Sequence, residues 1–368
     1  MNKLVIANLL HRPLRSIISI LAVAIEVVMI LSIVAIFMGM LDSQRERTNG
    51  IGADIVVTPS NASFMNGVGG APMSAKLVEV FRRLPHVTVA SPVITNFSMS
   101  GSVEILYGID YPSYNALKPF VFLSGGPFGG PFDVIIDDVF AREGHGHHVG
   151  ETIPILNNHP FRICGIVESG KGGRKLIPID TMGTLTGSEG KASEFYLKTD
   201  NAANDNLVIK EIHSTPGLQD YRTLTMSDLI ALYTPSHFPG FDLALRVVIS
   251  IAVIVGFLVI FQSMYTAVLE RTREIGILKS LGSSKLTIVS VVLRETSVLA
   301  IVGVMVGIAA TYGVKELLHI KFSTFSFELT PAWFGWGSLI AFAGALLGAL
   351  YPAWMAARKD PIDALAYE

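Results

Sequence analysis

Two segments of this 368-residue chain combine residue types and spacings that could bind a ligand. The first, Gly165-Ile-Val-Glu-Ser-Gly170-Lys171-Gly172, matches a nucleotide-binding Walker A loop at every position except the last. Gly172 stands where a Ser or Thr hydroxyl would hold magnesium, and Pro178 follows where a helix should run. We therefore interpret this segment as a glycine-rich hairpin turn. If the chain works with ATP, the ATPase must be a separate polypeptide.

The second segment is a histidine cluster, with His145, His147 and His148 spaced by glycine and with Glu143 and His159 nearby. Histidines at this density can bind zinc or copper. Histidines on a flexible loop also bind such metals weakly without a function, so we assign no metal site. The chain has no His-Glu-x-x-His, Gly-x-Ser-x-Gly or Cys-x-x-Cys motif. We predict that it is not an enzyme and binds no cofactor itself.

A third segment is charged and lies between two long apolar runs. Its sequence is Glu270-Arg-Thr-Arg-Glu-Ile-Gly-Ile-Leu-Lys-Ser-Leu-Gly282. At helical spacing its side chains separate onto two faces. The apolar face takes Ile275, Ile277, Leu278 and Leu281, and the charged face takes Arg271, Arg273, Glu274 and Lys279. A short helix of this kind at the cytoplasmic surface is suited to docking into a groove on a soluble partner, which would drive this chain.

The elements that must position this segment are membrane spans. Half of the residues are hydrophobic, 16% are charged and the mean hydropathy is +0.51, which is typical of a membrane protein. Four apolar stretches reach the roughly 20 residues that a helix needs to cross a bilayer. The first is too long for a signal peptide, so we expect a retained anchor. No basic stripe indicates nucleic acid as a partner.

Lys and Arg residues near the ends of the spans predict the orientation. They gather before the first span, between the second and third, and after the fourth, which places both termini in the cytoplasm. The predicted division is a cytoplasmic amphipathic helix at 1–16, spans at 17–41, 247–269, 290–313 and 332–356, an extracytoplasmic domain at 42–246, a cytoplasmic coupling helix at 270–289, an outer loop at 314–331 and a cytoplasmic tail at 357–368.

The segment 42–246 has the pattern of a folded α+β domain. Short apolar runs bounded by turn residues predict strands at 54–58, 103–107, 133–137, 161–167 and 207–210. Helices are expected at 74–84, 138–143 and 227–232. Two loops rich in Gly and Pro are expected to be mobile, Asn66–Pro72 and the near repeat Gly125–Phe132.

Polar and small residues within the spans indicate how the helices meet. Glu26 lies near the middle of the first span, and its two interpretations are a polar contact with substrate or a structural contact with another span. Arg294 and Glu295, like Asp242 and Arg246, are interpreted as interfacial anchors. Small residues four apart predict close helix packing, namely Gly303, Gly307, Gly344 and Gly348.

With this topology and charged segment, the chain resembles the MacB/FtsX-like permeases of ABC transporters, also called type VII or mechanotransmission systems. Its layout is similar to that of lipoprotein-releasing and DevC-type glycolipid exporter permeases. The segments that carry the resemblance are Asn8–Arg15, Gly52–Pro59, Phe161–Val167, Glu270–Gly282 and Tyr351–Leu365. The resemblance covers essentially the full length, and the last two segments are its most specific part. It implies four transmembrane helices with a large extracytoplasmic domain between helices 1 and 2.

The resemblance also implies the partners and the mechanism. The chain would pair with a second permease, a copy or a similar chain, and with two copies of a cytoplasmic ATPase that use ATP and Mg. A membrane-fusion or adaptor protein is a further partner that it allows, and the bacterial inner membrane is the expected location. Glu270, Arg271, Arg273 and Glu274 would contact the ATPase, Ile275, Ile277 and Leu278 would fill its groove, and Gly276 and Gly282 would turn the backbone.

Three functions remain open at this point. The first is ATP-driven export or extraction of an amphiphile, peptide or lipoprotein. The second is a non-transporting signalling subunit that regulates an envelope enzyme. The third is a receptor or scaffold without an ATPase, which leaves the charged segment unexplained. The size of the outer domain and its two Gly/Pro loops favour the first.

Overall fold

The computed structural model describes residues 13–60, 73–98, 104–234, 237, 241–321 and 326–359. These residues divide into two compact units. The helical unit contains the chain up to Gly39 and most of it after residue 240, and the sheet unit contains the segment from Met40 to residue 239.

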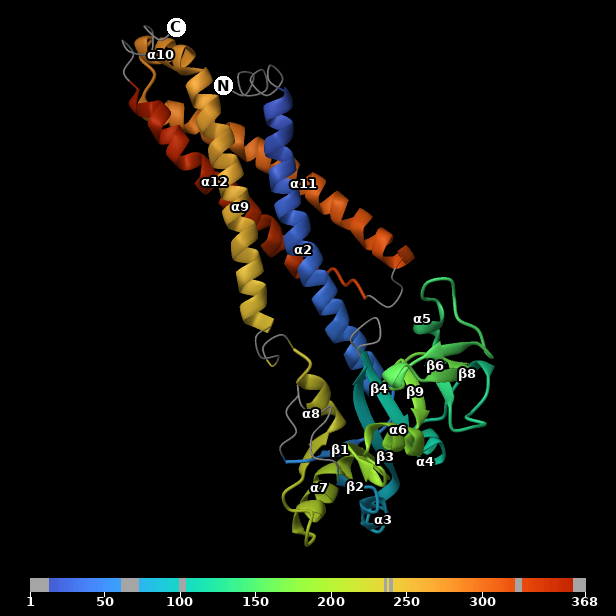
Figure 1. The fold of residues 1–368 in the computed structure, drawn as a ribbon. Helices are drawn as coiled ribbons and strands as arrows, with labels where there is room; N and C mark the ends of the chain where they lie inside the picture. Colours follow the sequence, from blue (N-terminus) through green and yellow to red (C-terminus); the bar gives the residue numbers. More distant parts are fainter. Residues whose placement is uncertain are drawn as a thin grey trace. The chain divides into compact units, whose positions relative to one another are not determined.

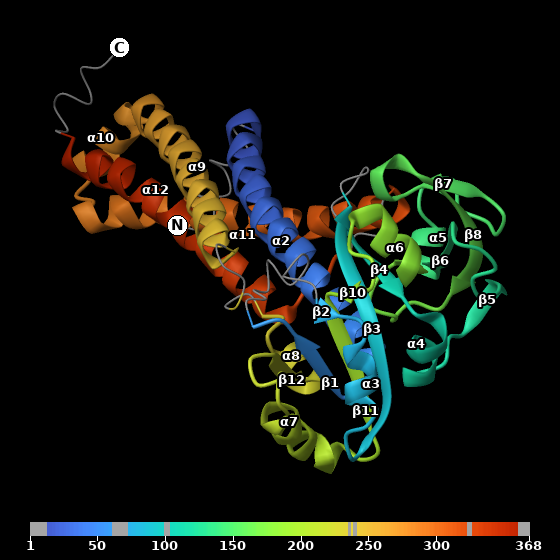
Figure 2. The ribbon, with the colours of Figure 1, turned by 60° about the horizontal axis from the view of Figure 1, so that its bottom comes forward.

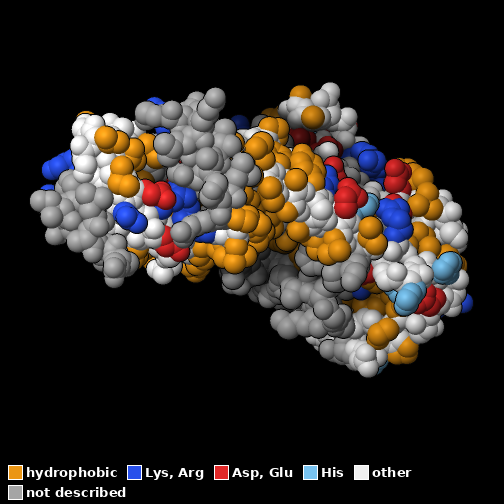
Figure 3. Space-filling model, turned by 90° about the horizontal axis from the view of Figure 1, so that it is seen from above, with side chains coloured by type: hydrophobic (Ala, Val, Ile, Leu, Met, Phe, Trp, Pro, Cys, Tyr) orange, Lys and Arg blue, Asp and Glu red, His pale blue; other side chains and the backbone are white. Residues whose placement is uncertain are grey.

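The helical unit is built from four helices that are long and apolar enough to cross a membrane, among the residues described. They are α2 (Pro13–Asn49), α9 (Phe241–Glu270), α11 (Lys285–Lys321) and α12 (Pro331–Arg358), and Figure 1 shows the short α10 (Thr272–Ser280) between α9 and α11. Hydrophobic side chains cover broad areas of the visible surface in Figure 3, as expected for helices that face lipid. Because α11 extends to Lys321, much of the first half of the predicted outer loop 314–331 is helical.

The sheet unit has one large mixed sheet with the strand order β12-β1-β11-β3-β4-β9-β6-β8-β5, and β7 pairs with β8. Among the described strand pairs, only β4–β9 and β6–β8 are parallel. Figure 2 shows β3, the longest strand, crossing the unit. The strands are β1 (Ile55–Thr58), β2 (Met73–Ser74), β3 (Val87–Ser98), β4 (Glu104–Ile109), β5 (Phe122–Gly125), β6 (Asp133–Asp137), β7 (Thr152–Pro154), β8 (Pro160–Val167), β9 (Lys175–Pro178), β10 (Lys191–Ala192), β11 (Glu194–Thr199) and β12 (Arg222–Thr225).

Helices and three apolar clusters complete the sheet unit. The helices are α3 (Leu77–Phe81), α4 (Tyr111–Leu117), α5 (Asp138–Ala141), α6 (Ile179–Thr186), α7 (Asp205–Ser214) and α8 (Met226–Ala231), with single 3-10 turns at Leu156–Asn158 and Ala202–Asn204. The mixed α+β architecture between the first span and the rest confirms the predicted fold class.

One predicted strand is wrong. The segment 207–210 lies inside α7, because Val208 and Ile212 are spaced by four and both point into the core beside β1 and β11. The helix predicted over 74–84 is reduced to α3, since Met73 and Ser74 pair with β10.

The loop from Gly125 to Phe132, predicted to be mobile, is held in place. The amides of Gly129 and Gly130 donate to the Asp133 carboxylate at 2.7 and 2.8 Å. Arg162 binds the same carboxylate, and the Thr181 hydroxyl donates to the Pro131 carbonyl at 2.6 Å. The other predicted mobile loop, Asn66–Pro72, lies outside the described residues.

Candidate coupling site

The charged segment forms α10, a nine-residue helix that follows α9 after a break at Arg271. It ends before Gly282, whose φ of +92° is a left-handed conformation that favours glycine. The helix therefore occupies the first part of the predicted segment 270–289. Gly276 does not turn the backbone as expected, because it lies inside α10 and is buried.

One face of α10 packs on the ends of the other helices of this unit. Thr272, Ile275 and Gly276 are buried, and Ile275 belongs to an apolar cluster with Val268 of α9 and Ile288 of α11. The prediction that Ile275 and Ile277 share one apolar face is therefore wrong. Two residues along a helix turn the side chain by about 200°, so the two isoleucines point to opposite sides.

The opposite face of α10 is exposed and mixes charged with apolar side chains. Ile277 is 45% exposed and Leu281 is 79% exposed, although both are large hydrophobic residues. Arg273 and Glu274 lie exposed one turn before them, while Leu278 is half-buried. This exposed strip, defined here as the α10 outer face, consists of Arg273, Glu274, Ile277, Ser280 and Leu281.

Lys279 holds α10 against the end of α12. Its ammonium group donates to the carbonyl of Ala357 at 3.1 Å and to that of Lys359. A cation at the last carbonyls of a helix satisfies acceptors that have no partner within the helix. Lys279 was expected on the face that meets a partner, but the structure gives it a role in fixing α10.

Arg271 enters a buried ion cluster instead of the exposed face. Its guanidinium lies 3.0 Å from one oxygen of Glu295, and the guanidinium of Arg15 lies 3.0 Å from the other. Glu270 lies 3.8 Å from Arg15 at the rim of the same cluster. The interpretation of Glu295 as an interfacial anchor is wrong, because its side chain is 5% exposed and bridges α2, α11 and the α9–α10 corner.

The four glycines predicted to pack closely all lie at contacts between helices. A Cβ at Gly303 or Gly307 of α11 would lie 2.7 Å from the Cβ of Val23 or Val27 of α2, respectively. A Cβ at Gly348 of α12 would lie 2.8 Å from the Phe257 carbonyl oxygen of α9. Gly344 is less crowded, with its nearest neighbour at 3.5 Å.

That nearest neighbour of Gly344 is the carboxyl group of Glu26, which lies among α2, α9 and α12. Glu26 is 3% exposed, and neither of its carboxyl oxygens has a hydrogen-bond partner among the described residues. On the α9 side it faces Gly256, where a Cβ would lie 1.9 Å from a carboxyl oxygen. The structure thus places Glu26 against two other spans.

The segment that resembles a Walker A loop connects β8 to β9 and is not a hairpin, because β6 lies between these strands. Lys171 is 7% exposed and donates to the carbonyl of Lys118 at 2.6 Å. Burial, with the charges of Lys118 and Lys198, lowers the pKa of Lys171 to about 8. This amine therefore bonds a carbonyl group inside the sheet unit and does not project outward to bind a phosphate.

The same loop clasps the end of α2 where that helix belongs to the sheet unit. The Gly172 amide donates to the Arg47 carbonyl at 3.0 Å. The Tyr114 hydroxyl donates to the Lys171 carbonyl at 3.0 Å and fixes the loop from the other side. The backbones of Gly50 and Gly170 approach so closely that a Cβ at Gly50 would lie 1.9 Å from the Gly170 carbonyl oxygen. We call this contact the α2 clasp.

One side chain of the histidine cluster has partners within the fold. Nδ1 of His147 lies 2.9 Å from Glu151, and the ring stacks on Phe140. In the part of the chain that the structure describes, no three His, Cys, Asp or Glu side chains could hold a metal ion together.

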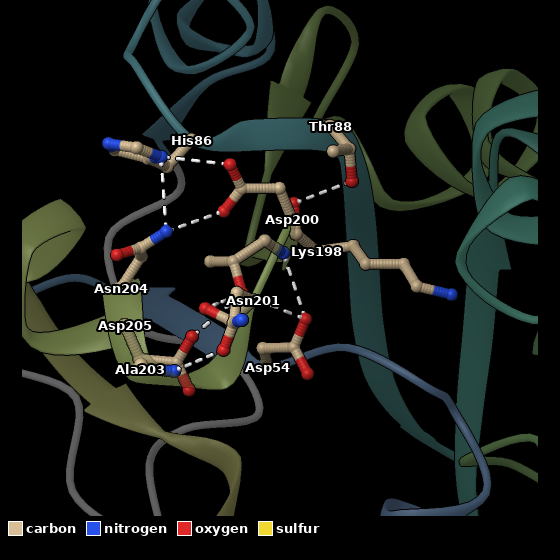
Figure 4. A network of polar contacts seen from close by, with 10 residues as sticks. Asp54, His86, Thr88, Lys198, Asp200, Asn201, Ala203, Asn204 and Asp205 are labelled. Carbon is tan, nitrogen blue, oxygen red and sulfur yellow. Dashed lines mark hydrogen bonds and ion pairs between the residues drawn. The ribbon is translucent and has the colours of Figure 1, made fainter.

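A polar network ties the start of β3 to the end of β11 and the start of α7 (Figure 4). Asp200 accepts from Asn204 at 2.8 Å and lies 2.8 Å from His86, and these bonds hold its pKa below the ordinary value. Thr199 bridges Asp54 and Asp205 at 3.2 and 2.7 Å. Every carboxylate of this network thus has a donor within the fold, which identifies the network as structural.

A pH-dependent stability follows from Glu194 of β11. The Tyr196 hydroxyl donates to its carboxyl group at 3.0 Å, and burial raises the pKa of Glu194 to about 7. The folded state then keeps a proton that the unfolded chain releases from about pH 4.5 upward. The stabilisation is complete below that pH and is lost as the pH rises towards 7.

We expect Glu194→Gln to remove this dependence, because Gln copies the neutral acid. From this rise in pKa, wild type should lose about 3 kcal/mol more than the variant between pH 4.5 and 8. Unfolding of the full chain in detergent, followed by fluorescence at both pH values, measures the difference. Parallel pH profiles for the two proteins would contradict the assignment.

Two protein families match this chain. Residues 16–215 match the MacB-like periplasmic core domain, and residues 246–361 match the FtsX-like permease C-terminal domain. The first match covers α2 and most of the sheet unit, and the second covers most of α9 and all of α10 to α12. The chain therefore belongs to the MacB/FtsX-like permeases of ABC transporters, and it is a multi-pass membrane protein.

Relatives are known at low sequence identity. The uncharacterized ABC transporter permease YknZ of Bacillus subtilis is 26% identical over 412 residues, covering 100% of this chain and 98% of the relative. The macrolide export ATP-binding/permease protein MacB of Wolinella succinogenes is 26% identical over 400 residues, which cover 100% of this chain and 60% of MacB. MacB of Chromobacterium violaceum is 28% identical over 250 residues, 64% of this chain and 38% of that protein. The chain thus spans only part of the MacB relatives.

Among solved structures, the periplasmic region of MacB from Actinobacillus actinomycetemcomitans covers 49% of this chain, with 15% identity and a TM-score of 0.38. The extracellular domain of YknZ covers 47%, with 15% identity and a TM-score of 0.35. TM-scores this low support no conclusion about this chain beyond the family matches.

Proposed function

We propose that this chain is the permease subunit of an ATP-driven transporter and that a separate cytoplasmic ATPase drives it through α10. Two ATPase copies and a second permease would complete the complex, and an adaptor protein outside the membrane is a further candidate partner. The cargo would be an amphiphile, a peptide or a lipoprotein that is exported or extracted. The MacB relatives are named as ATP-binding and permease proteins in one chain, whereas YknZ is named as a permease.

The observation that carries the proposal is the division of α10 into two faces. One face is fixed to α9, α11 and α12 by Ile275 and Lys279. The other face exposes Ile277 and Leu281 next to charged residues, which is the composition of a docking surface. A partner that displaces the outer face must therefore displace the ends of the spans.

The proposed roles follow from this geometry. ATP and Mg would be used by the partner, because the Lys171 amine of the Walker-like loop is already bonded within the sheet unit. The excess of Lys and Arg in the segments before α2, around α10 and after α12 supports a cytoplasmic location for both termini and α10, with the sheet unit outside the bacterial inner membrane.

We expect Glu274→Arg to lower permease-stimulated ATP hydrolysis by at least ~10-fold, because it reverses a charge within the docking surface. The measurement is ATP hydrolysis by the complex purified with the tagged chain from its native membrane in mild detergent. Membrane content of the variant is checked by immunoblot.

Glu316→Arg is the matched control for this experiment. Glu316 is an exposed glutamate on α11, about 45 Å along the helix from its start beside α10. Its replacement should leave hydrolysis unchanged. Full activity of Glu274→Arg, or an equal loss in both variants, would argue against docking through α10.

A further inference from the structure

Glu26 is the only Asp, Glu, Lys, Arg or His in the apolar middle of the four spans. On each span, the nearest other charged residue lies at least nine residues, or about 13 Å, from the level of Glu26. No cation of these helices is therefore in position to pair with its carboxyl group. The charged residues nearest to it are Arg15 and Asp42 on α2, Arg246 and Glu270 on α9, Glu295 and Lys315 on α11, and Arg358 on α12, and the nearest tyrosines are Tyr265, Tyr312 and Tyr351.

The carboxyl group of Glu26 is enclosed by two glycines of other spans. A Cβ at Gly256 of α9 would lie 1.9 Å from one of its oxygens, and a Cβ at Gly344 of α12 would lie 3.5 Å from the other. A hydrogen atom on the Gly256 Cα points in the direction of that missing Cβ, so it meets the carboxyl oxygen in a weak C–H···O contact. Val253 of α9 lies beside Gly344 and adds an apolar wall. We call this enclosure the carboxyl pocket.

The carboxyl pocket suits a proton and no larger ligand. The side chain of Glu26 is 3% exposed, and neither of its buried oxygens has a hydrogen-bond partner among the described residues. A metal cation takes several oxygen ligands, whereas the two glycines and the valine offer only C–H groups here. A cargo molecule does not reach the oxygens in this packing, which argues against a substrate contact. A carboxylate at this depth without a counter-ion is strongly disfavoured, and a neutral carboxylic acid avoids that cost.

We propose that the carboxyl pocket is a proton-binding site and that the proton on Glu26 keeps α9 and α12 packed on α2. The inference goes beyond the proposed function and needs no ATPase. When the O–H bond breaks, the proton passes to water and the electron pair stays on the carboxylate. This charge has no partner in the pocket, so the side chain moves towards water and the contacts at Gly256 and Gly344 open.

Infrared spectroscopy of the full chain tests the protonation state directly, because a neutral carboxylic acid and a carboxylate have different stretching bands. The chain carries Glu194→Gln, which removes the buried acid of the sheet unit whose pKa is about 7. It is purified in dodecyl maltoside, a detergent without a carbonyl group. Spectra at about pH 7, where exposed carboxyl groups are ionised, are compared with and without Glu26→Gln.

We expect Glu26→Gln to remove a neutral carboxylic acid band and to leave the carboxylate bands unchanged. Glu26→Met, which keeps the length of the side chain, should remove the same band if Glu26→Gln does not fold. The folded state keeps a proton that the unfolded chain releases, so the unfolding midpoint of the Glu194→Gln chain should fall as the pH rises. Either substitution at Glu26 should abolish this fall.

A double-substitution cycle tests the pocket itself. Gly256→Ala should lower the unfolding midpoint by roughly 5 °C or more, because its Cβ displaces the carboxyl group. In a Glu26→Ala background, which vacates this space, the same substitution should cost less than about half as much. Gly344→Ala is the control, because its Cβ would lie at an ordinary contact distance and should be tolerated.

Three results would overturn the inference. Loss of a carboxylate band in Glu26→Gln would show that Glu26 is ionised in the fold. Equal costs of Gly256→Ala in the two backgrounds would show that the carboxyl group does not occupy the pocket. An unchanged pH dependence of the midpoint in Glu26→Gln would show that the proton is not linked to helix packing. None of these measurements involves the ATPase, so the proposed function stands or fails separately.

Discussion

Gly50→Ala is expected to break the α2 clasp and to destabilise the sheet unit by about 2–4 kcal/mol. The new Cβ would lie 1.9 Å from the carbonyl oxygen of Gly170 and 2.9 Å from its Cα. All of these atoms are backbone, so no rotation of a side chain relieves the overlap. The loop must move, and the bond from the Gly172 amide to the Arg47 carbonyl is then lost.

The measurement is the unfolding midpoint of the full chain in detergent, which should fall by roughly 5 °C or more for a domain of this size. Limited proteolysis should also cut the β8–β9 loop sooner. Gly126→Ala is the matched control, because a Cβ at Gly126 meets nothing within 4 Å. Equal midpoints for the two variants would mean that the sheet unit holds α2 without this contact.

The sequence was most informative where the apolar pattern is local. The run Asp133–Asp137 forms β6 with the predicted bounds, because five buried residues flanked by turn signals leave few alternatives. The run at 207–210 is also short and apolar but lies in α7. A short apolar run does not distinguish a strand from a buried helical turn; Asp205 in the first turn and Ile212 one turn later provide the helical signal.

The candidate site was also predictable from the sequence only in part. Composition and spacing predict a short helix at α10, and the structure contains it. They do not predict which face is covered, since this depends on the ends of α11 and α12, which come later in the chain. The ion cluster could not be predicted, because the Arg15–Glu295 contact spans 280 positions and nothing in the local sequence of Glu295 identifies its partner.

The glycines of α11 show a pattern that the sequence reveals only in part. Four-residue spacing of Gly303 and Gly307 predicts a close helix contact, but it does not name the helix that is contacted. The structure assigns α2, with Val23 and Val27 lying over the two glycines.

Gly307→Leu is expected to prevent α2 and α11 from packing and to cost about 3 kcal/mol or more. Its Cβ alone would lie 2.7 Å from the Cβ of Val27 and 2.9 Å from the Ala24 carbonyl oxygen, and the rest of the side chain would enter the α2 backbone. Separation of this pair would also pull Arg15 from Glu295, because both contacts follow the same register.

Gly313→Leu provides the comparison on the same helix. Gly313 lies six residues further along α11, it is exposed, and a Cβ there meets nothing within 4 Å. Size-exclusion chromatography of the detergent-solubilised chains should give a monodisperse peak for Gly313→Leu and a large loss of that peak for Gly307→Leu. If both variants elute like wild type with equal unfolding midpoints, the α2–α11 pair is not closely packed.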